Sequence, residues 1–256
     1  METHSPIVLI TGATSGIGLA AAKKFAQAGY RLVLLARRIE RLRALKVVLE
    51  DEHGIEAQIL VADVRNRTQL ETALNSLPEN WYCPDVLINN AGLALGLGTI
   101  DQGNPDDWDV MVDTNIKGLL YVTSIISKRM VSKEKGHIIN IASIAGKEVY
   151  PNGNVYCATK FAVDALSRAM RIDLLHAGIK VTNIAPGMVE TEFSLVRFKG
   201  DAQRAEQTYK GLKPLSAEDI AEAIWFAASQ PPHVNINDIL LTPLAQGSTR
   251  DAIRKT

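Results

Sequence analysis

Short apolar runs alternate along this chain with stretches in which apolar residues recur at helical spacing. The runs are short and rich in β-branched residues, which is typical of strands buried on both faces of a sheet. They predict strands at 7–10, 31–36, 57–61, 86–88, 137–141, 180–184 and 238–242. The stretches between them predict helices, one reaching about 28 after the first strand and others at about 38–52, 66–77, 105–130, 156–176 and 217–229. Residues 188–213 show a less regular pattern.

Repeated strand-helix-strand units with short connections predict a parallel, doubly wound α/β sheet of the Rossmann type. The 256 residues suffice for one large domain and no stretch has the composition of a linker, so we expect a single domain over 1–256. Ligands of such sheets bind at the carboxyl ends of the strands. The motifs described below lie at such ends.

The first predicted strand leads directly into a glycine-rich turn, TGATSGIG at residues 11–18, and a helix follows. Glycines allow a tight turn and a close approach of the backbone, and the free N–H groups and dipole at a helix N-terminus bind anions. This order of elements predicts a phosphate site, although a glycine-rich loop can also be a simple turn. The residues assigned to the site are Gly12, Thr14, Ser15, Gly16, Ile17 and Gly18.

The end of the second predicted strand indicates which dinucleotide would bind. An acidic residue at this position grips the 2′-hydroxyl of the NAD ribose, but this chain has Ala36 followed by Arg37 and Arg38. Two guanidinium groups suit a 2′-phosphate, which favours NADP over NAD. The alternative is that the two arginines only form a charge cluster at the start of an exposed helix.

Ser143, Tyr156 and Lys160 are the candidate chemical groups. Tyr156 and Lys160 are four residues apart at the head of a predicted helix, so their side chains share one face. A nearby ammonium lowers the pKa of a phenol, which makes Tyr156 a candidate general acid and base. We expect Ser143, which follows the strand at 137–141, to face Tyr156 across a cleft and to hold the reacting oxygen. Taken alone, a tyrosine and a lysine at this spacing usually cover a solvated helix face.

Charge and composition argue against several functions. The chain has 28 Lys and Arg against 28 Asp and Glu, and this zero net charge gives no electrostatic case for nucleic acid or an anionic membrane as a partner. We find no apolar stretch of membrane-spanning length and no signal peptide pattern, so we expect a soluble, cytoplasmic protein. The two cysteines and five scattered histidines show no ligand spacing, and we expect no metal site.

Six motifs follow one another on the predicted elements: Thr11-Gly12-x-x-x-Gly16-x-Gly18, Asn89-Asn90-Ala91-Gly92, Asn115, Ser143, Tyr156-x-x-x-Lys160 and Pro186-Gly187. In these motifs the chain, from residue 11 to about 243, resembles the short-chain dehydrogenase/reductase family. The resemblance implies hydride transfer with NADP, in which Tyr156 donates or removes a proton and Ser143 positions the substrate oxygen. It also implies that Lys160 lowers the pKa of Tyr156 and holds the nicotinamide ribose. Asn115 would anchor a water relay, a role that is compatible with stabilising a bend in its helix.

The resemblance also has implications for cofactor contacts, assembly and substrate access. It implies adenine contacts at Asp63 and Val64, ribose contacts at Asn90, Ala91 and Gly92, and nicotinamide contacts at Pro186, Gly187, Val189 and Thr191, besides Tyr156 and Lys160. It implies a homotetramer, in which the apolar edge at 239–241 would be covered. Residues 188–213 would form a lid over a small-molecule substrate.

Longer stretches at 89–96, 191–200 and 233–237 are similar to one branch of this family, the NADP-dependent 3-hydroxy acid dehydrogenases. That branch includes serine and L-allo-threonine dehydrogenases and malonic semialdehyde reductase, which implies a substrate such as L-serine, L-allo-threonine or 3-hydroxypropionate. A small acid needs a cation for its carboxylate, and Arg197 suits this role because its planar group matches a carboxylate. The alternative is that Arg197 and Lys199 are solvated charges on a flexible segment.

Two other functions are compatible with the same fold. The first is a reductase of 3-oxoacyl thioesters or of general ketones and aldehydes. The second is a nucleotide sensor without catalytic activity, and the intact set of Asn115, Ser143, Tyr156 and Lys160 argues against it.

Overall fold

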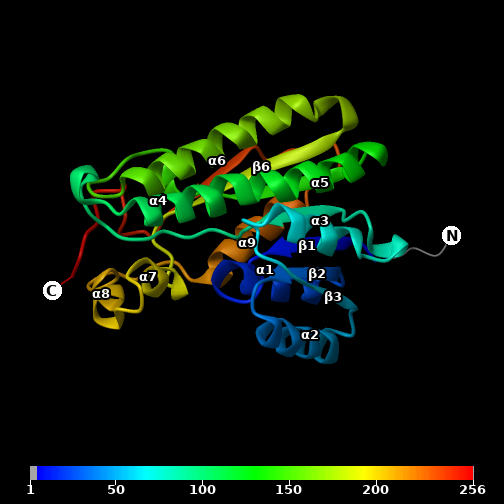
Figure 1. Ribbon diagram of the computed structural model, residues 1–256, viewed down its shortest axis with the longest axis horizontal. Coiled ribbons are helices and arrows are strands. Elements are labelled where there is room, and N and C mark those ends of the chain that lie inside the picture. The colour runs from blue at the N-terminus through cyan, green and yellow to red at the C-terminus, as the bar shows by residue number, and fades with distance from the viewer. Residues whose placement is uncertain (1–4, 256) are drawn as a thin grey trace.

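Seven parallel strands form one sheet in the computed structural model, which describes residues 5–255 (Figure 1). The strand order is β3-β2-β1-β4-β5-β6-β7, so the winding direction reverses between β1 and β4. The strands are β1 (Ile7–Thr11), β2 (Arg31–Ala36), β3 (Ala57–Val61), β4 (Val86–Asn89), β5 (Gly136–Ile141), β6 (Ile179–Pro186) and β7 (Asp238–Leu241). This arrangement confirms the predicted α/β fold with a doubly wound parallel sheet. The reversal places a crevice at the carboxyl ends of the central strands.

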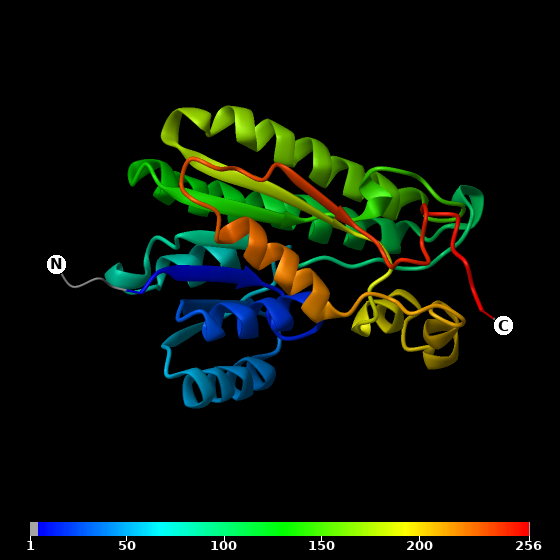
Figure 2. The ribbon, with the colours of Figure 1, turned by 180° about the vertical axis from the view of Figure 1, so that it is seen from behind.

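Helices cover both faces of the sheet, because its central strands are apolar on both sides. Along β1, Leu9 contributes to the core on one face and Ile10 to the core on the other. Both side chains are fully buried, and burying one large aliphatic side chain contributes about 1.5–3 kcal/mol. One face packs against α3 (Arg67–Asn75), α5 (Leu119–Ser132) and α6 (Asn154–Asp173), and the other against α1 (Gly16–Gln27), α2 (Ile39–His53) and α9 (Ala217–Ala228) (Figures 1 and 2).

The helical stretch predicted at 105–130 contains a turn of π-helix that the sequence pattern does not reveal. It consists of α4 (Pro105–Val112), the π-helical turn Asp113–Gly118 and then α5. Within the turn, Gly118 packs so closely on Val64 that an added Cβ would lie 2.8 Å from the Val64 Cγ2 atom. Because a π-helical turn inserts an extra residue into the helix, it changes which side chains face inward, and the buried Asn115 lies on this turn.

Two further element ends differ from the predicted ones. The helix predicted to reach about 176 ends at Asp173, because a short 3₁₀ turn follows and Gly178 adopts the left-handed conformation with φ +66°. Strand β6 continues beyond the predicted end at 184 to Pro186, where it pairs with Leu241 of β7. The longer strand brings Pro186 and Gly187 to the crevice.

Residues 188–213 contain two short helices, α7 (Glu192–Arg197) and α8 (Ala202–Gln207). They form a lobe beyond the carboxyl ends of the strands, drawn in yellow and gold (Figures 1 and 2). Each begins with a polar cap: the Thr191 hydroxyl accepts a hydrogen bond from the Phe193 N–H, and the Asp201 carboxylate accepts one from the Arg204 N–H. Across the described residues 5–255, no helix combines the length and apolar character needed to cross a membrane.

Candidate active site

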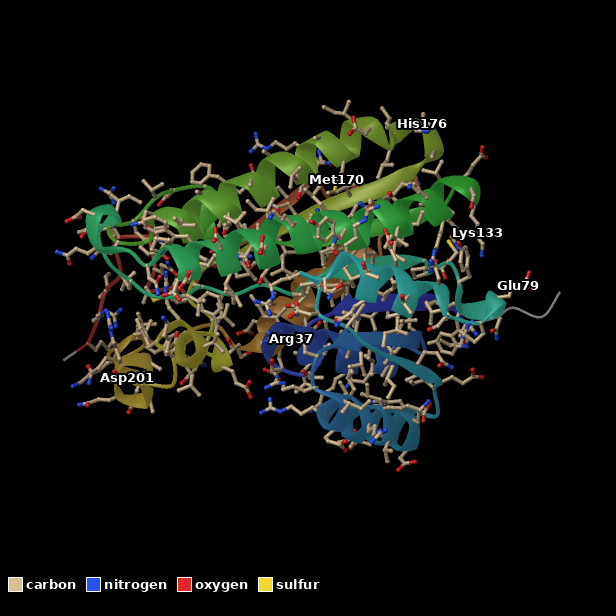
Figure 3. The ribbon with its side chains drawn as sticks, in the orientation of Figure 1. Arg37, Glu79, Lys133, Met170, His176 and Asp201 are labelled. Carbon is tan, nitrogen blue, oxygen red and sulfur yellow. The ribbon has the colours of Figure 1, made fainter. Side chains whose placement is uncertain are left out.

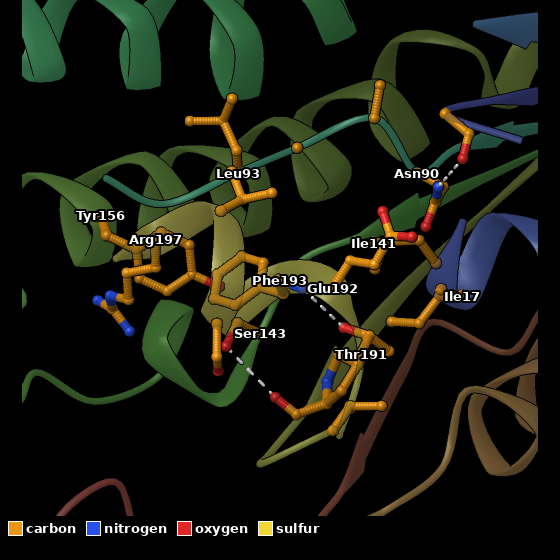
Figure 4. Close-up of a pocket in the computed structure, with 18 of the residues that line it drawn as sticks. Ile17, Asn90, Leu93, Ile141, Ser143, Tyr156, Thr191, Glu192, Phe193 and Arg197 are labelled. Carbon is orange, nitrogen blue, oxygen red and sulfur yellow. Dashed lines mark hydrogen bonds between the residues drawn. The ribbon is translucent and has the colours of Figure 1, made fainter. Parts of the chain in front are cut away.

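A cavity of about 550 Å³ lies at the carboxyl ends of the strands, where the winding reverses. Part of its lining is shown in Figure 4. The sequence-predicted residues that line it are Gly12, Thr14, Ser15, Gly16, Ile17, Arg37, Arg38, Asp63, Val64, Asn90, Ala91, Gly92, Ser143, Tyr156, Lys160, Pro186, Gly187, Val189, Thr191 and Arg197. Gly18 and Asn115 are not among the lining residues, but each contacts a residue that is.

The glycine-rich turn leaves no room for a side chain at Gly12 or Gly18. Gly12 adopts φ +66°, and an added Cβ would lie 3.0 Å from the Nδ2 atom of Asn90. At Gly18 an added Cβ would lie 2.4 Å from the same Nδ2 atom, so this glycine permits the close packing behind the turn. The Asn90 amide fixes this arrangement by donating to the Thr11 and Gly12 carbonyls, at 2.9 and 3.2 Å.

The start of α1 has the features of an anion site. Its N-cap residue, Ser15, makes no side-chain capping bond, and no acidic residue lies in its first turn. The N–H groups at the start of the helix and the positive end of its dipole therefore face the cavity uncompensated by side-chain carboxylates. The start of α1 could therefore hold a diphosphate.

The charged residues after β2 and β3 line the adjoining part of the cavity. Arg37 is 63% exposed at its side chain, and its Nη1 atom lies 3.9 Å from an Asp63 oxygen. Figure 3 shows Arg37 at the end of the sheet from which α7 and α8 project. The Arg38 guanidinium donates to the Thr14 hydroxyl at 3.2 Å. Partial burial opposes ionisation of Asp63, but hydrogen bonds from Arg65 outweigh it and lower the pKa of Asp63.

Ser143 and Tyr156 meet in the other half of the cavity. Ser143 follows β5, and its hydroxyl accepts a hydrogen bond from the Ala145 N–H at 3.1 Å and donates to the Pro186 carbonyl at 3.3 Å (Figure 4). The Tyr156 ring packs edge-on against Phe193, with ring centroids 5.6 Å apart. Burial raises the pKa of Tyr156 far above its ordinary value of 10.0, while the neighbouring Ser143 hydroxyl and the charge of Arg197 act in the opposite direction.

Lys160 lies deeper, on the same helix. Its Nζ atom donates to the Ile141 carbonyl at 2.8 Å and lies 5.9 Å from the centroid of the Tyr156 ring. Burial lowers the pKa of Lys160 from 10.5 to about 8. The expected net lowering of the Tyr156 pKa by Lys160 is not what the structure gives, because burial dominates at the phenol and the nearer cation is Arg197.

Arg197, at the end of α7, is the cation beside Tyr156. Its Cζ atom lies 5.2 Å from the centroid of the Tyr156 ring (Figure 4). Its guanidinium donates to the Tyr150 hydroxyl and to the Gly96 carbonyl, the latter at 3.3 Å. Lys199, the other cation considered for this role, instead pairs with Asp107 at 2.9 Å and does not line the main cavity.

Asn115 acts as a brace behind the site. Its Oδ1 atom accepts from the Leu93 N–H at 2.9 Å, and its Nδ2 atom donates to the Leu93 carbonyl at 2.8 Å and to the Thr159 hydroxyl at 3.0 Å. These contacts hold the loop after β4 against the helix that carries Lys160. The side chain therefore ties this loop to α6, and its expected part in a water relay stays a prediction.

Tyr150 and Gln246 line the cavity but were not identified from the sequence. Gln246 is 5% exposed, and its Oε1 atom accepts a hydrogen bond from the Met188 N–H at 2.8 Å, so it fixes the chain just after β6. It lies beyond the last strand, where no pattern marks it. The only sequence signal for Tyr150 is its position between Ser143 and Tyr156.

Comparisons with known proteins agree with this geometry. Residues 6–201 match the family described as short chain dehydrogenase. The chain is 48% identical to the NADP-dependent 3-hydroxy acid dehydrogenase of Salmonella typhi over 94% of its own length and 96% of that protein. It is 44% identical to the sulfoacetaldehyde reductase of Chromohalobacter salexigens, with 96% and 97% of the two chains covered. The closed form of a serine dehydrogenase complexed with NADP⁺ superposes with a TM-score of 0.91 at 45% identity, covering 98% of this chain and 100% of that one.

Proposed function

This chain belongs to the short-chain dehydrogenase family, and we propose that it is an NADP-dependent oxidoreductase of small 3-hydroxy acids. Hydride would pass between the cofactor and the 3-hydroxyl or 3-carbonyl of a substrate such as L-serine, L-allo-threonine, 3-hydroxypropionate or malonic semialdehyde. The observation that carries this proposal is the position of Arg197, a cation 5.2 Å from the Tyr156 ring and within the same cavity. The relatives named for 3-hydroxy acids and for serine support it.

The cavity residues fit NADP at two places. The turn at Gly12 and Gly16 and the uncapped start of α1 would hold the diphosphate, and Arg37 and Arg38 would hold the 2′-phosphate. When bound, the cofactor supplies the hydride acceptor or donor, its nicotinamide C4 atom. Lys160 would bind the nicotinamide ribose, and the chain around Pro186 and Thr191 would border the nicotinamide.

Ser143 and Tyr156 would position the substrate oxygen and transfer its proton. Ser143 lies close enough to Tyr156 to stabilise its phenolate, so a substrate oxygen held by the Ser143 hydroxyl would sit next to the phenol. Because burial keeps the phenol protonated, Tyr156 would act as the acid when a carbonyl is reduced. In the opposite direction it would accept the proton of the alcohol after losing its own.

Arg197 would select the substrate by its charge. Its planar guanidinium suits a carboxylate, and the Tyr150 hydroxyl to which it donates can shift to the same anion. A 3-oxoacyl thioester or a simple ketone offers no anion at this distance from the reacting carbon. Sulfoacetaldehyde does, since it carries a sulfonate, and the named reductase of that compound makes it a second candidate substrate.

A steady-state panel with NADP⁺ tests this proposal. Serine and 3-hydroxypropionate are compared with 2-hydroxy acids of the same size and with secondary alcohols that lack the carboxylate. The alcohols lack a charge-assisted contact of about 1.5–3 kcal/mol, so their kcat/KM should be about 10–10²-fold lower than that of the acids. Arg197→Ala should remove that difference.

Lys199→Ala is the matched control, because it removes a cation from the same segment that pairs with Asp107 instead. It should leave the preference for acids intact. Equal kcat/KM of the wild type on uncharged alcohols would reject the proposed 3-hydroxy acid substrate but not the dehydrogenase activity. If isethionate, the alcohol that corresponds to sulfoacetaldehyde, is the best substrate, the result would favour a sulfonate over a carboxylate.

We further propose that residues 188–213 form a lid and that the enzyme is a cytoplasmic homotetramer. The lid is supported by the hydrogen bonds between Arg197 and the Gly96 backbone, which join α7 to the chain after β4. The tetramer is supported by exposed apolar residues on the long helix α6 and the 3₁₀ turn after it, and in and just after β7, which the pairing of subunits would cover. They are Phe161, Ile172, Leu175, Leu240 and Leu244.

A further inference from the structure

An acidic residue of α7 that lines the cavity contacts Arg41 of α2 and the N-cap residue of that helix, Arg38. The Glu192 carboxylate lies 3.0 and 3.2 Å from the Arg41 Nη1 atom and 3.6 Å from the Arg38 Nη1 atom. The contact with Arg41 joins residues that are 151 positions apart in the chain. The Glu192 carboxylate is therefore paired with arginine side chains in the region that the proposed function assigns to a 2′-phosphate.

The backbone fixes where this carboxylate can reach. Glu192 is the first residue of α7 and follows the N-cap residue Thr191. Thr191 in turn packs on the glycine-rich turn, where an added Cβ at Gly16 would lie 3.3 Å from the Thr191 Cβ atom. The start of α7 is thus held over the cradle, with the Glu192 side chain directed at α2.

The arginine side has a matching geometry. Arg38 bonds Thr14 of the glycine-rich turn through Nη2, which leaves Nη1 on the Glu192 side. Arg41 lies three residues further along α2, one helical turn away, so it presents its guanidinium next to that of Arg38. Arg41 has no sequence signal for cofactor binding, because it lies within the helix and not at the end of the strand.

We infer that Glu192 and Arg41 set the preference between NADP and NAD: Glu192 competes with the 2′-phosphate for Arg38 and Arg41. The inference rests on the proposed use of NADP. A 2′-phosphate carries more charge than a carboxylate and forms stronger bonds with a guanidinium, so it displaces Glu192 and gains Arg41 as a further partner. NAD has no such group and leaves the Glu192 contacts in place.

The position of Glu192 connects this exchange with the substrate half of the cavity. Glu192 begins α7 and Arg197 ends it, so both lie on one short helix. Release of Glu192 from α2 frees the start of the helix whose other end holds the guanidinium beside Tyr156. Cofactor discrimination and substrate recognition thus act on the same rigid element.

Equilibrium binding of NADPH and NADH, followed by cofactor fluorescence, tests the inference without relying on turnover. Glu192→Gln removes the competing charge but keeps the shape of the side chain, so NADPH should bind about two- to fivefold more tightly, the range of an exposed ion pair, with NADH unchanged. Glu190→Gln is the matched control, because it removes an exposed carboxylate two residues earlier. It should change neither constant.

Arg41→Ala completes a double-mutant cycle. If Glu192 occupies Arg41 in competition with the phosphate, the loss of NADPH affinity on Arg41→Ala should be larger in the Glu192→Gln protein than in the wild type. Equal weakening of NADPH and NADH by Glu192→Gln would overturn the inference and make the contact a clamp on α7. Unchanged binding of both would overturn it as well. A wild-type protein that binds neither cofactor would reject the proposed function itself.

Discussion

The ammonium group of Lys160 is buried, and burying its charge lowers the stability of the folded protein as long as the group is protonated. The pH dependence of the free energy of unfolding therefore tests whether Lys160 is buried and titrates as described. The lysine is 6% exposed, and burial lowers its pKa from 10.5 to about 8. Between these two values the unfolded chain keeps the proton on Lys160 and the folded protein releases it. The unfolded state then binds more protons, so stability rises with pH across this interval and the gain is lost as pH falls through about 8.

The size of the effect follows from the two pKa values. A shift from 10.5 to about 8 corresponds to about 3 kcal/mol, at ~1.4 kcal/mol per pKa unit. Lys160→Met keeps much of the apolar stem and removes the titrating group. Between about pH 7.5 and about pH 10.5, the free energy of unfolding of the wild type should therefore gain about 3 kcal/mol relative to the variant.

Urea unfolding, followed by circular dichroism over this pH range, measures the difference. Both proteins need the same concentration, because subunit association shifts the midpoint. Tyr156 and Cys83, whose pKa values burial raises, titrate in both proteins and cancel in the comparison. A difference between wild type and variant that stays constant across the range would refute the buried, titrating Lys160.

Three further predictions concern the proton, the cofactor and the assembly. Tyr156→Phe keeps the ring and removes its ionisable oxygen, so turnover should fall about 10²–10⁴-fold with cofactor binding retained; near-normal steady-state turnover would contradict the proton role. Replacing Arg37 and Arg38 together by alanine should weaken binding of NADPH more than that of NADH, by about 3 kcal/mol, and an equal loss would assign both arginines to the helix start. Light scattering at micromolar concentration should give the mass of four chains, and a monomer would exclude the tetramer.

The fold was predictable because it depends on patterns that are local in the sequence. Each strand of a parallel sheet is buried on both faces, so runs such as 32–36 stand out as continuous apolar segments. The glycine-rich turn was predictable for a similar reason, since Gly12 needs a left-handed backbone and Gly18 has no space for a side chain. Such requirements restrict the residue type itself and are visible in a single sequence.

The parts of the site that depend on long-range contacts were not predictable. Asn115 on the π-helical turn forms hydrogen bonds with Leu93, which lies 22 residues earlier, and no periodicity records that contact. The same holds for Gln246 beneath Met188 and for Glu192 against Arg41. The pKa of Tyr156 was misjudged because the i+4 spacing shows where a cation lies but not how completely the phenol is buried.

Burial places the proton of this site on Tyr156, because the Ser143 hydroxyl and the Arg197 guanidinium do not offset the loss of solvent around the phenol. Reduction of a carbonyl uses a protonated tyrosine and starts from this state, whereas oxidation of an alcohol first requires the proton to leave. Arg197 is also the cation proposed for the substrate carboxylate, and a bound anion weakens the influence of that cation on the phenol. If Arg197 binds the substrate carboxylate as proposed, substrate charge and proton position would be coupled through one guanidinium, and an anionic substrate would reinforce the protonated form of Tyr156.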